Sequence, residues 1–163
     1  MKRITYTNTL PYEKTTHAGA PYRIGTAYRN HGQLCESIVK WRLGLYTEVN
    51  PNTSFDEGSD IEELRASVKS HKCSLAKGLR GETMDEKVND FITRGHSTTW
   101  VWVEWNEKTE LVDEYWMDET EFRAFCKRFL TNDPRGANKI NPRFMNTTYR
   151  KPWLDSRAVV ALG

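Results

Sequence analysis

The sequence has no long apolar run. Its 163 residues are 37% hydrophobic and 28% charged, and no segment approaches the roughly 20 consecutive apolar residues that a membrane-spanning helix requires. The amino terminus starts with positive charge, but no apolar segment follows it, so we expect no secretory signal. The composition argues against a membrane protein and predicts a folded protein in the cytoplasm.

Cysteine is scarce and has no metal-binding spacing. Cys35, Cys73 and Cys126 are odd in number, and none belongs to a C-x-x-C pair. This argues against a disulfide framework and against a structural zinc site. We therefore expect reduced thiols with a packing role. The four histidines also lack ligand spacing, and we expect them to be hydrated or packed.

Motifs of two common enzyme classes are missing. Residues 78–81 contain two glycines, but these have neither the G-x-G-x-x-G spacing nor the Walker spacing of a phosphate-binding loop. No serine lies in a G-x-S-x-G elbow, the turn that presents the nucleophile of α/β-hydrolases. The sequence gives little support to either class.

The length fits one domain with three parts. Residues 1–31 contain Gly, Pro, Thr and Tyr without a clear period, which predicts an irregular lead-in. Residues 32–130 carry the periodic segments of a core. Residues 131–163 form a basic carboxyl-terminal arm, because Pro134 to Arg157 contains six cations and one anion. That segment has a charge of +5, and the rest of the chain sums to −3.

Two interpretations of the basic arm stay open. Basic and aromatic residues alternate in it, as in Tyr149-Arg150-Lys151, and this composition suits a phosphate backbone and unstacked bases. The alternative is a solvated arm whose aromatic side chains pack on the domain.

Periodicity predicts a helix over residues 32–45. Leu34, Ile38, Trp41 and Leu45 share one face at about 100° per residue. Glu36 lies on another face, near apolar residues. A buried acid is costly without a partner, so Glu36 is either a surface residue or a functional one.

The remaining elements predict an α/β fold. In the segment Asp60–Ser70, Ala66 and Val68 face a core while Ser67 and Lys69 share the opposite face. A helix follows from about Thr83. The segments 98–105 and 110–117 form a hairpin, and an amphipathic helix covers 119–130. The order implies a mixed sheet of about four to five strands flanked by helices.

Three segments resemble the PD-(D/E)XK nuclease superfamily, the restriction-endonuclease-like fold. The helix over residues 32–39 resembles the opening helix that contributes a glutamate. Gly58-Ser59-Asp60-Ile61 is similar to the strand that presents the aspartate, and Ala66-Ser67-Val68-Lys69-Ser70 is similar to the E-x-K strand. The resemblance covers roughly residues 32–130 and implies a DNA endonuclease that depends on Mg²⁺ or Mn²⁺.

The resemblance also implies roles for single residues. Asp60 would bind the metal directly, Glu36 would act through a metal-bound water, and the backbone carbonyl of Val68 would complete the shell. Lys69 would orient the attacking water or stabilise charge on the scissile phosphate. His71 and Lys72, after the strand, would contact phosphate, as would three residues of the basic arm: Arg143, Arg150 and Lys151. Many members of the superfamily cut two strands as dimers, so a homodimer is plausible.

Ser67 departs from the family pattern. A hydroxyl replaces the second acid, so a site of Glu36, Asp60 and Ser67 carries −2 where the pattern carries −3. Three cases are open: an active nuclease in which Glu62 or Glu63 supplies the acid, an active nuclease with weak metal binding, and an inactive module that binds nucleic acid or a protein. An interaction domain without nucleic-acid contact is a further alternative.

Overall fold

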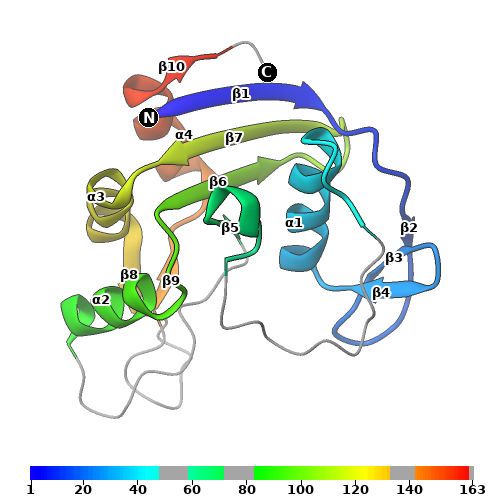
Figure 1. Ribbon diagram of the computed structural model, residues 1–163, viewed down its shortest axis with the longest axis horizontal. Helices are drawn as coiled ribbons and strands as arrows, with labels where there is room; N and C mark the ends of the chain where they lie inside the picture. The colour runs from blue at the N-terminus through cyan, green and yellow to red at the C-terminus, as the bar shows by residue number, and fades with distance from the viewer. Residues whose placement is uncertain (48–58, 72–82, 133–141, 162–163) are drawn as a thin grey trace.

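A five-stranded mixed sheet forms the centre of the protein (Figure 1). The computed structural model describes residues 1–47, 59–71, 83–132 and 142–161. The strand order is β10 (Val159–Val160), β1 (Lys2–Thr7), β7 (Leu111–Met117), β6 (Thr99–Trp105) and β5 (Ala66–Ser70). The pairs β5·β6 and β1·β10 are parallel, and β6·β7 and β1·β7 are antiparallel. The prediction of an α/β fold with a mixed sheet is confirmed.

The two central strands form the predicted hairpin. β6 is rich in β-branched and aromatic residues, which favour a pleated and buried surface. The Asn106 side chain closes the turn, because its Oδ1 accepts hydrogen bonds from the amides of Lys108 and Thr109. Side chains then alternate between the two faces of the sheet, with Trp102 on one face and Val103 on the other.

One helix covers the first face of the sheet. α1 (His31–Arg42) begins at a capping box formed by Asn30 and Gln33. Its buried residues Leu34 and Ile38 belong to the same core as Val101, Val103 and Val112. The helix ends three residues earlier than predicted, and Trp41, expected on its apolar face, is 41% exposed.

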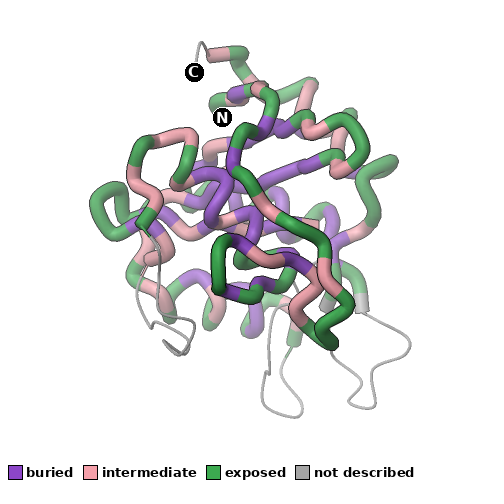
Figure 2. The backbone as a smooth tube through the Cα atoms, turned by 90° about the vertical axis from the view of Figure 1, so that its right-hand side faces the viewer, coloured by how far each residue is buried: buried purple, intermediate pink, exposed green. Residues whose placement is uncertain are grey.

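Three helices cover the opposite face. α2 (Met84–Arg94) begins after Thr83, as predicted, and α3 (Glu119–Phe129) begins at a capping box of Asp118 and Glu121. α4 (Thr147–Arg157) completes this layer. The core here is aromatic and includes Trp100, Trp102, Tyr115, Phe122, Phe125 and Leu154. The buried stretches therefore concentrate in the sheet and the helix faces turned to it (Figure 2).

The prediction of an irregular lead-in is wrong. β1 lies inside the main sheet, and β2 (Glu13–Lys14), β3 (Tyr22–Ile24) and β4 (Ala27–Arg29) form a small second sheet. The sequence hides β1 because Ile4 is its one buried apolar residue among polar neighbours. Those neighbours hold the strand through side-chain bonds: Arg3 and Thr5 donate to Asp113.

In the described residues the carboxyl-terminal segment is not an arm, but its aromatic side chains pack on the domain, as one of the two interpretations expected. β8 (Leu130–Asn132) pairs with β9 (Pro142–Phe144), α4 packs on the sheet, and β10 joins its edge. Phe144 and Leu154 are buried in the aromatic core. The segment was unrecognisable as a helix because it is mostly polar and contains Pro152.

Two further expectations concern cysteines and membranes. Cys35 and Cys126 are buried and belong to no disulfide among the described residues, and Cys73 lies outside those residues. In the part of the chain that the structure describes, no helix has the length and apolar character needed to cross a bilayer.

Candidate functional site

A tight turn brings Asp60 to the free edge of β5. On one side β5 pairs with β6, and on the other Ile61 forms an isolated bridge with Ala66 through hydrogen bonds of 3.0 and 3.1 Å. The 3₁₀ turn η1 (Glu62–Leu64) and Arg65, whose φ is +46°, reverse the chain between them. Ser59 is bound to Ser97 through their hydroxyls at 2.8 Å, which holds the segment ahead of Asp60.

The Asp60 carboxylate accepts two hydrogen bonds at this edge. The Val68 amide donates to Oδ2 at 2.7 Å, and the Ser67 hydroxyl lies 3.4 Å from the same oxygen. The carboxyl group of Glu36 approaches from α1 and interacts with Asp60. The structure therefore brings together the two acids that the sequence placed on separate elements.

The environment of Glu36 favours the protonated form of its carboxyl group. Burial raises the pKa of Glu36 to about 9, and the hydrogen bond to Asp60 and the negative charge of Asp60 act in the same direction. The charges of Lys40 and Lys69 oppose the shift without cancelling it. The raised pKa favours a protonated Glu36 at neutral pH, and a positive charge near the two acids would favour its deprotonation.

The Val68 carbonyl lies beside this pair. Arg65 accepts from the amides of Thr98 and Thr99 at the start of β6, so residues 65, 67 and 69 turn their backbone groups toward β6. Val68 turns its amide and carbonyl to the free edge, where the amide meets Asp60. A backbone oxygen and two carboxyl groups therefore converge at one edge.

Lys69 reaches the site from the other face of the sheet. The burial of β5 alternates as predicted, with Ala66 and Val68 buried and Ser67 and Lys69 half-buried. The Lys69 ammonium lies 4.9 Å from the centre of the Phe91 ring of α2. Its charge acts on Glu36 across the edge of β5, so the acids and the lysine approach this edge from opposite sides.

These groups fit a hard divalent cation. Mg²⁺ takes one or two carboxylates together with waters and substrate oxygens, and Glu36, Asp60 and the Val68 carbonyl supply that set. Among the described residues there is no group of three or more His, Cys, Asp or Glu side chains placed to hold a metal ion.

No family model, curated protein or solved structure matches this chain. The resemblance to the nuclease superfamily consequently rests on the sequence motifs alone.

The predicted substitutes for the missing acid lie elsewhere on the turn. Glu62 and Glu63 are exposed residues of η1. Within the described ranges, neither forms a hydrogen bond or ion pair with Glu36, Asp60 or Lys69. Ser67 acts here as a hydrogen-bond donor to Asp60. The carboxyl charge of the described site is therefore that of Glu36 and Asp60.

Arg150 was wrongly predicted to contact nucleic acid. It is 1% exposed, its Nε and Nη2 donate to Glu104 at 2.6 and 3.0 Å, and its guanidinium lies over the Trp102 ring. Arg150 therefore fixes α4 to the sheet. The signal that sequence reasoning missed is Glu104, an acid between Val103 and Trp105 in an apolar strand.

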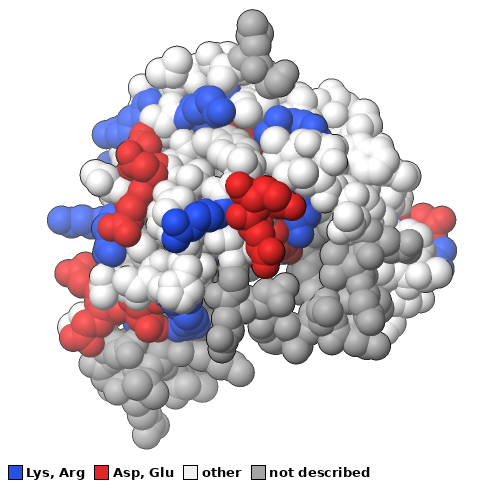
Figure 3. Space-filling model, in the orientation of Figure 1, with Lys and Arg blue, Asp and Glu red and all other residues white. Residues whose placement is uncertain are grey.

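The other residues predicted to contact phosphate lie in different parts of the fold. Lys151 pairs with Asp113 at 2.9 Å and with Asp155 at 3.5 Å, while Arg143 is an exposed residue of β9. The ring of His71 packs edge-on against His31 with centroids 4.3 Å apart. Lys72 lies outside the described residues. On the face shown in Figure 3, acidic and basic side chains are interspersed.

Proposed function

We propose that the protein is a DNA endonuclease that uses Mg²⁺ or Mn²⁺ to hydrolyse phosphodiester bonds. The observation that carries this proposal is the approach of the Glu36 carboxyl group to Asp60 at the outer edge of β5, the strand that also carries Lys69. Two acids placed close together favour a proton or a cation between them. An acid pair with a lysine on the same strand is a set of groups that metal-dependent hydrolysis of a phosphodiester would use.

Each residue has a chemical role in this proposal. A divalent cation at the site would supply an activated water and neutralise charge on the phosphate. Asp60 and Glu36 hold the cation with the Val68 carbonyl, and the Val68 amide and the Ser67 hydroxyl fix the orientation of Asp60. Lys69 orients the nucleophile or pairs with a phosphate oxygen. With Ser67 in the position of an acid, the fully ionised site carries −2, which predicts weak metal binding.

Cleavage assays test the proposal directly. Plasmid, linear and branched DNA are incubated with Mg²⁺ or Mn²⁺, and we expect metal-dependent cleavage that falls at least about 100-fold in Asp60→Asn and Lys69→Met. Glu63→Gln and Lys127→Met are matched controls, because each removes the same charge from an exposed residue. If none of the three substrates is cleaved, or if cleavage survives Asp60→Asn, the proposal is wrong.

The inactive module stays the second candidate because of Ser67. It predicts DNA binding that is unaffected by chelator and falls steeply with salt. Binding titrations in EDTA at several salt concentrations, together with the cleavage assay, separate the two functions, since metal-dependent turnover excludes the inactive module.

A cytoplasmic location and a homodimer belong to the same proposal. Two copies would place one site on each strand of a duplex. Sedimentation of the protein with and without DNA measures this, and a monomer on cleaved duplex would contradict the dimer.

A further inference from the structure

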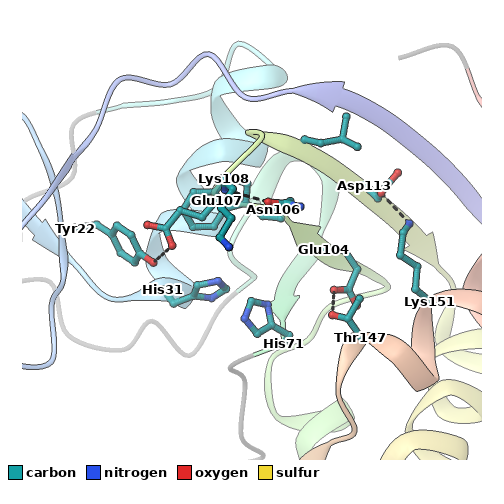
Figure 4. Close-up of a pocket in the computed structure, with 12 residues that line it drawn as sticks. Tyr22, His31, His71, Glu104, Asn106, Glu107, Lys108, Asp113, Thr147 and Lys151 are labelled. Carbon is teal, nitrogen blue, oxygen red and sulfur yellow. Dashed lines mark hydrogen bonds and ion pairs between the residues drawn. The ribbon is translucent and has the colours of Figure 1, made fainter.

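A cavity of about 580 Å³ lies beyond the end of β5. β5 ends at Ser70, opposite Val103, while β6 continues through Glu104 and Trp105. The space that β5 leaves is bounded on one side by the first residue of α1 and on the other by α4, with the β6–β7 turn between them (Figure 4). The cavity therefore opens beside the strand that carries Lys69.

Aromatic rings form one wall of the cavity. His31 and His71 point toward each other in Figure 4, and the His31 ring lies 5.7 Å from that of Trp105. Tyr22 packs on the same Trp105 ring at 5.7 Å. His31 is itself 6% exposed and lies 3.1 Å from the Ser70 hydroxyl. A wall of this kind accepts the face or edge of a planar ring.

The carboxylates of the opposite wall already have their own cations. Glu104 is bound by Arg150, and Asp113 is bound by Arg3 and Lys151. Their charges are compensated, but carboxylate oxygens retain lone pairs that accept further hydrogen bonds. An uncharged amino group of a ligand can therefore donate hydrogen bonds to Glu104 and Asp113, and the ligand needs no positive charge at this wall.

Lys108 adds a positive charge at the turn. Within the described part of the chain, its ammonium has no carboxylate partner at ion-pair distance, and the residue is exposed. The cavity thus offers a cation at its mouth, aromatic rings on one wall and carboxylate acceptors on the other. These features match the phosphate, the planar base and the exocyclic amino groups of a nucleotide. The volume lies within the roughly 300–1,000 Å³ of small-ligand sites.

The cavity is close to the carboxyl pair. Val68 and His71 are three residues apart on an extended chain, about 10 Å, and Glu36 and His31 are five residues apart on α1, about 7.5 Å. We propose that the cavity binds one unpaired nucleotide of the DNA strand beside the bond to be cleaved. This inference rests on the proposed function and narrows the substrate to DNA with an unpaired base next to the cleavage point.

Binding in EDTA tests the inference without cleavage. Fluorescence anisotropy compares a blunt duplex with the same duplex carrying a short overhang or a single bulged base. We expect the DNA with an unpaired base to bind at least about tenfold more tightly. Leu111→Trp, which fills the mouth of the cavity, and Lys108→Ala should remove this preference and leave blunt-duplex binding within about twofold.

Matched variants control for surface changes. Val159→Trp adds the same ring to exposed β10, and Lys127→Ala removes a lysine from exposed α3, so both should keep the preference. If Leu111→Trp does not fold, Thr147→Val is used in its place, because it removes a hydroxyl group from the cavity lining and should also remove the preference. Equal binding of all three DNAs, or a preference that survives Leu111→Trp and Lys108→Ala, would overturn the inference. Preferential binding without metal-dependent cleavage would contradict the proposed nuclease and support the cavity assignment. Metal-dependent cleavage without preferential binding would support the nuclease and contradict the cavity assignment.

Discussion

Replacing Glu36 by glutamine should make the metal-free protein less sensitive to pH. Glu36 is expected to be protonated in the folded state, because burial and the neighbouring Asp60 raise its pKa from an ordinary 4.5 to about 9. Glutamine has the same shape, is neutral at all pH values and still donates a hydrogen bond to Asp60. Glu36→Gln thus removes the titration and retains the contact.

The sign and size of the effect follow from proton linkage. Between pH 4.5 and 9 the folded state holds a proton that the unfolded state has released, so the free energy of unfolding decreases as pH rises. Each pH unit in this window costs about 1.4 kcal/mol. From pH 6 to pH 8 the wild-type protein should lose roughly 2–3 kcal/mol more than Glu36→Gln. The other titrating groups are common to both proteins and cancel in the difference.

Denaturant unfolding in EDTA at pH 6, 7 and 8 measures this difference, with Glu63→Gln as the control for loss of an exposed acid. At pH 8, addition of Mg²⁺ should stabilise the wild-type protein, because the cation replaces the proton of Glu36, and should leave Glu36→Gln unchanged. Parallel pH slopes for wild type and Glu36→Gln would refute the protonation of Glu36. Equal stabilisation of both by Mg²⁺ would refute the assignment of Glu36 as a ligand.

Three further predictions concern single contacts. Ser67→Glu restores a third carboxylate beside Asp60 and should tighten Mg²⁺ binding by about tenfold or more, measured by calorimetry; unchanged affinity would contradict this placement of Ser67. Arg150→Met leaves the buried Glu104 carboxylate unpaired and should cost about 3–5 kcal/mol of unfolding free energy, and adding Glu104→Gln should recover part of it, whereas additive losses would contradict the pair. Phe125→Ala removes a fully buried ring that contacts Trp102 and Phe144, and should cost about 3–5 kcal/mol in the same assay; a loss below 1 kcal/mol would contradict its central place.

The sequence predicts those helices and strands whose own apolar residues follow a regular period. The β6–β7 hairpin, the alternation of β5 and the buried phenylalanines of α3 all follow from local periodicity. β1 and α4 could not be predicted because their stability comes from distant polar partners. Arg3 bonds to Asp113, 110 residues away, and Arg150 bonds to Glu104, 46 residues away.

The candidate site could also be predicted from the sequence only in part. Glu36 and Lys69 could be named from residue type and order, since they lie on α1 and β5. Asp60 was expected on a strand, but it lies in a bend next to the isolated bridge of Ile61. The approach of Glu36 to Asp60 depends on the turn at Arg65, which has a left-handed conformation that no periodic pattern indicates. The protonation of Glu36 depends on burial, which only the assembled fold defines. The phosphate-binding role predicted for Arg150 is wrong because the residue is buried. The charge of a residue alone does not distinguish a buried ion pair from a surface contact.

The hydrogen bond from the Val68 amide to Asp60 also bears on solubility. An outer strand with unsatisfied amides is a template for another chain, and proteins block such strands to prevent aggregation. β5 is an outer strand, and its outward groups are capped by Ile61 and by the Asp60 carboxylate. Replacing Asp60 by alanine would uncap the strand, so self-association is the expected side effect of that variant. The carboxylate proposed to bind the cation thus also blocks pairing of β5 with other copies of the chain.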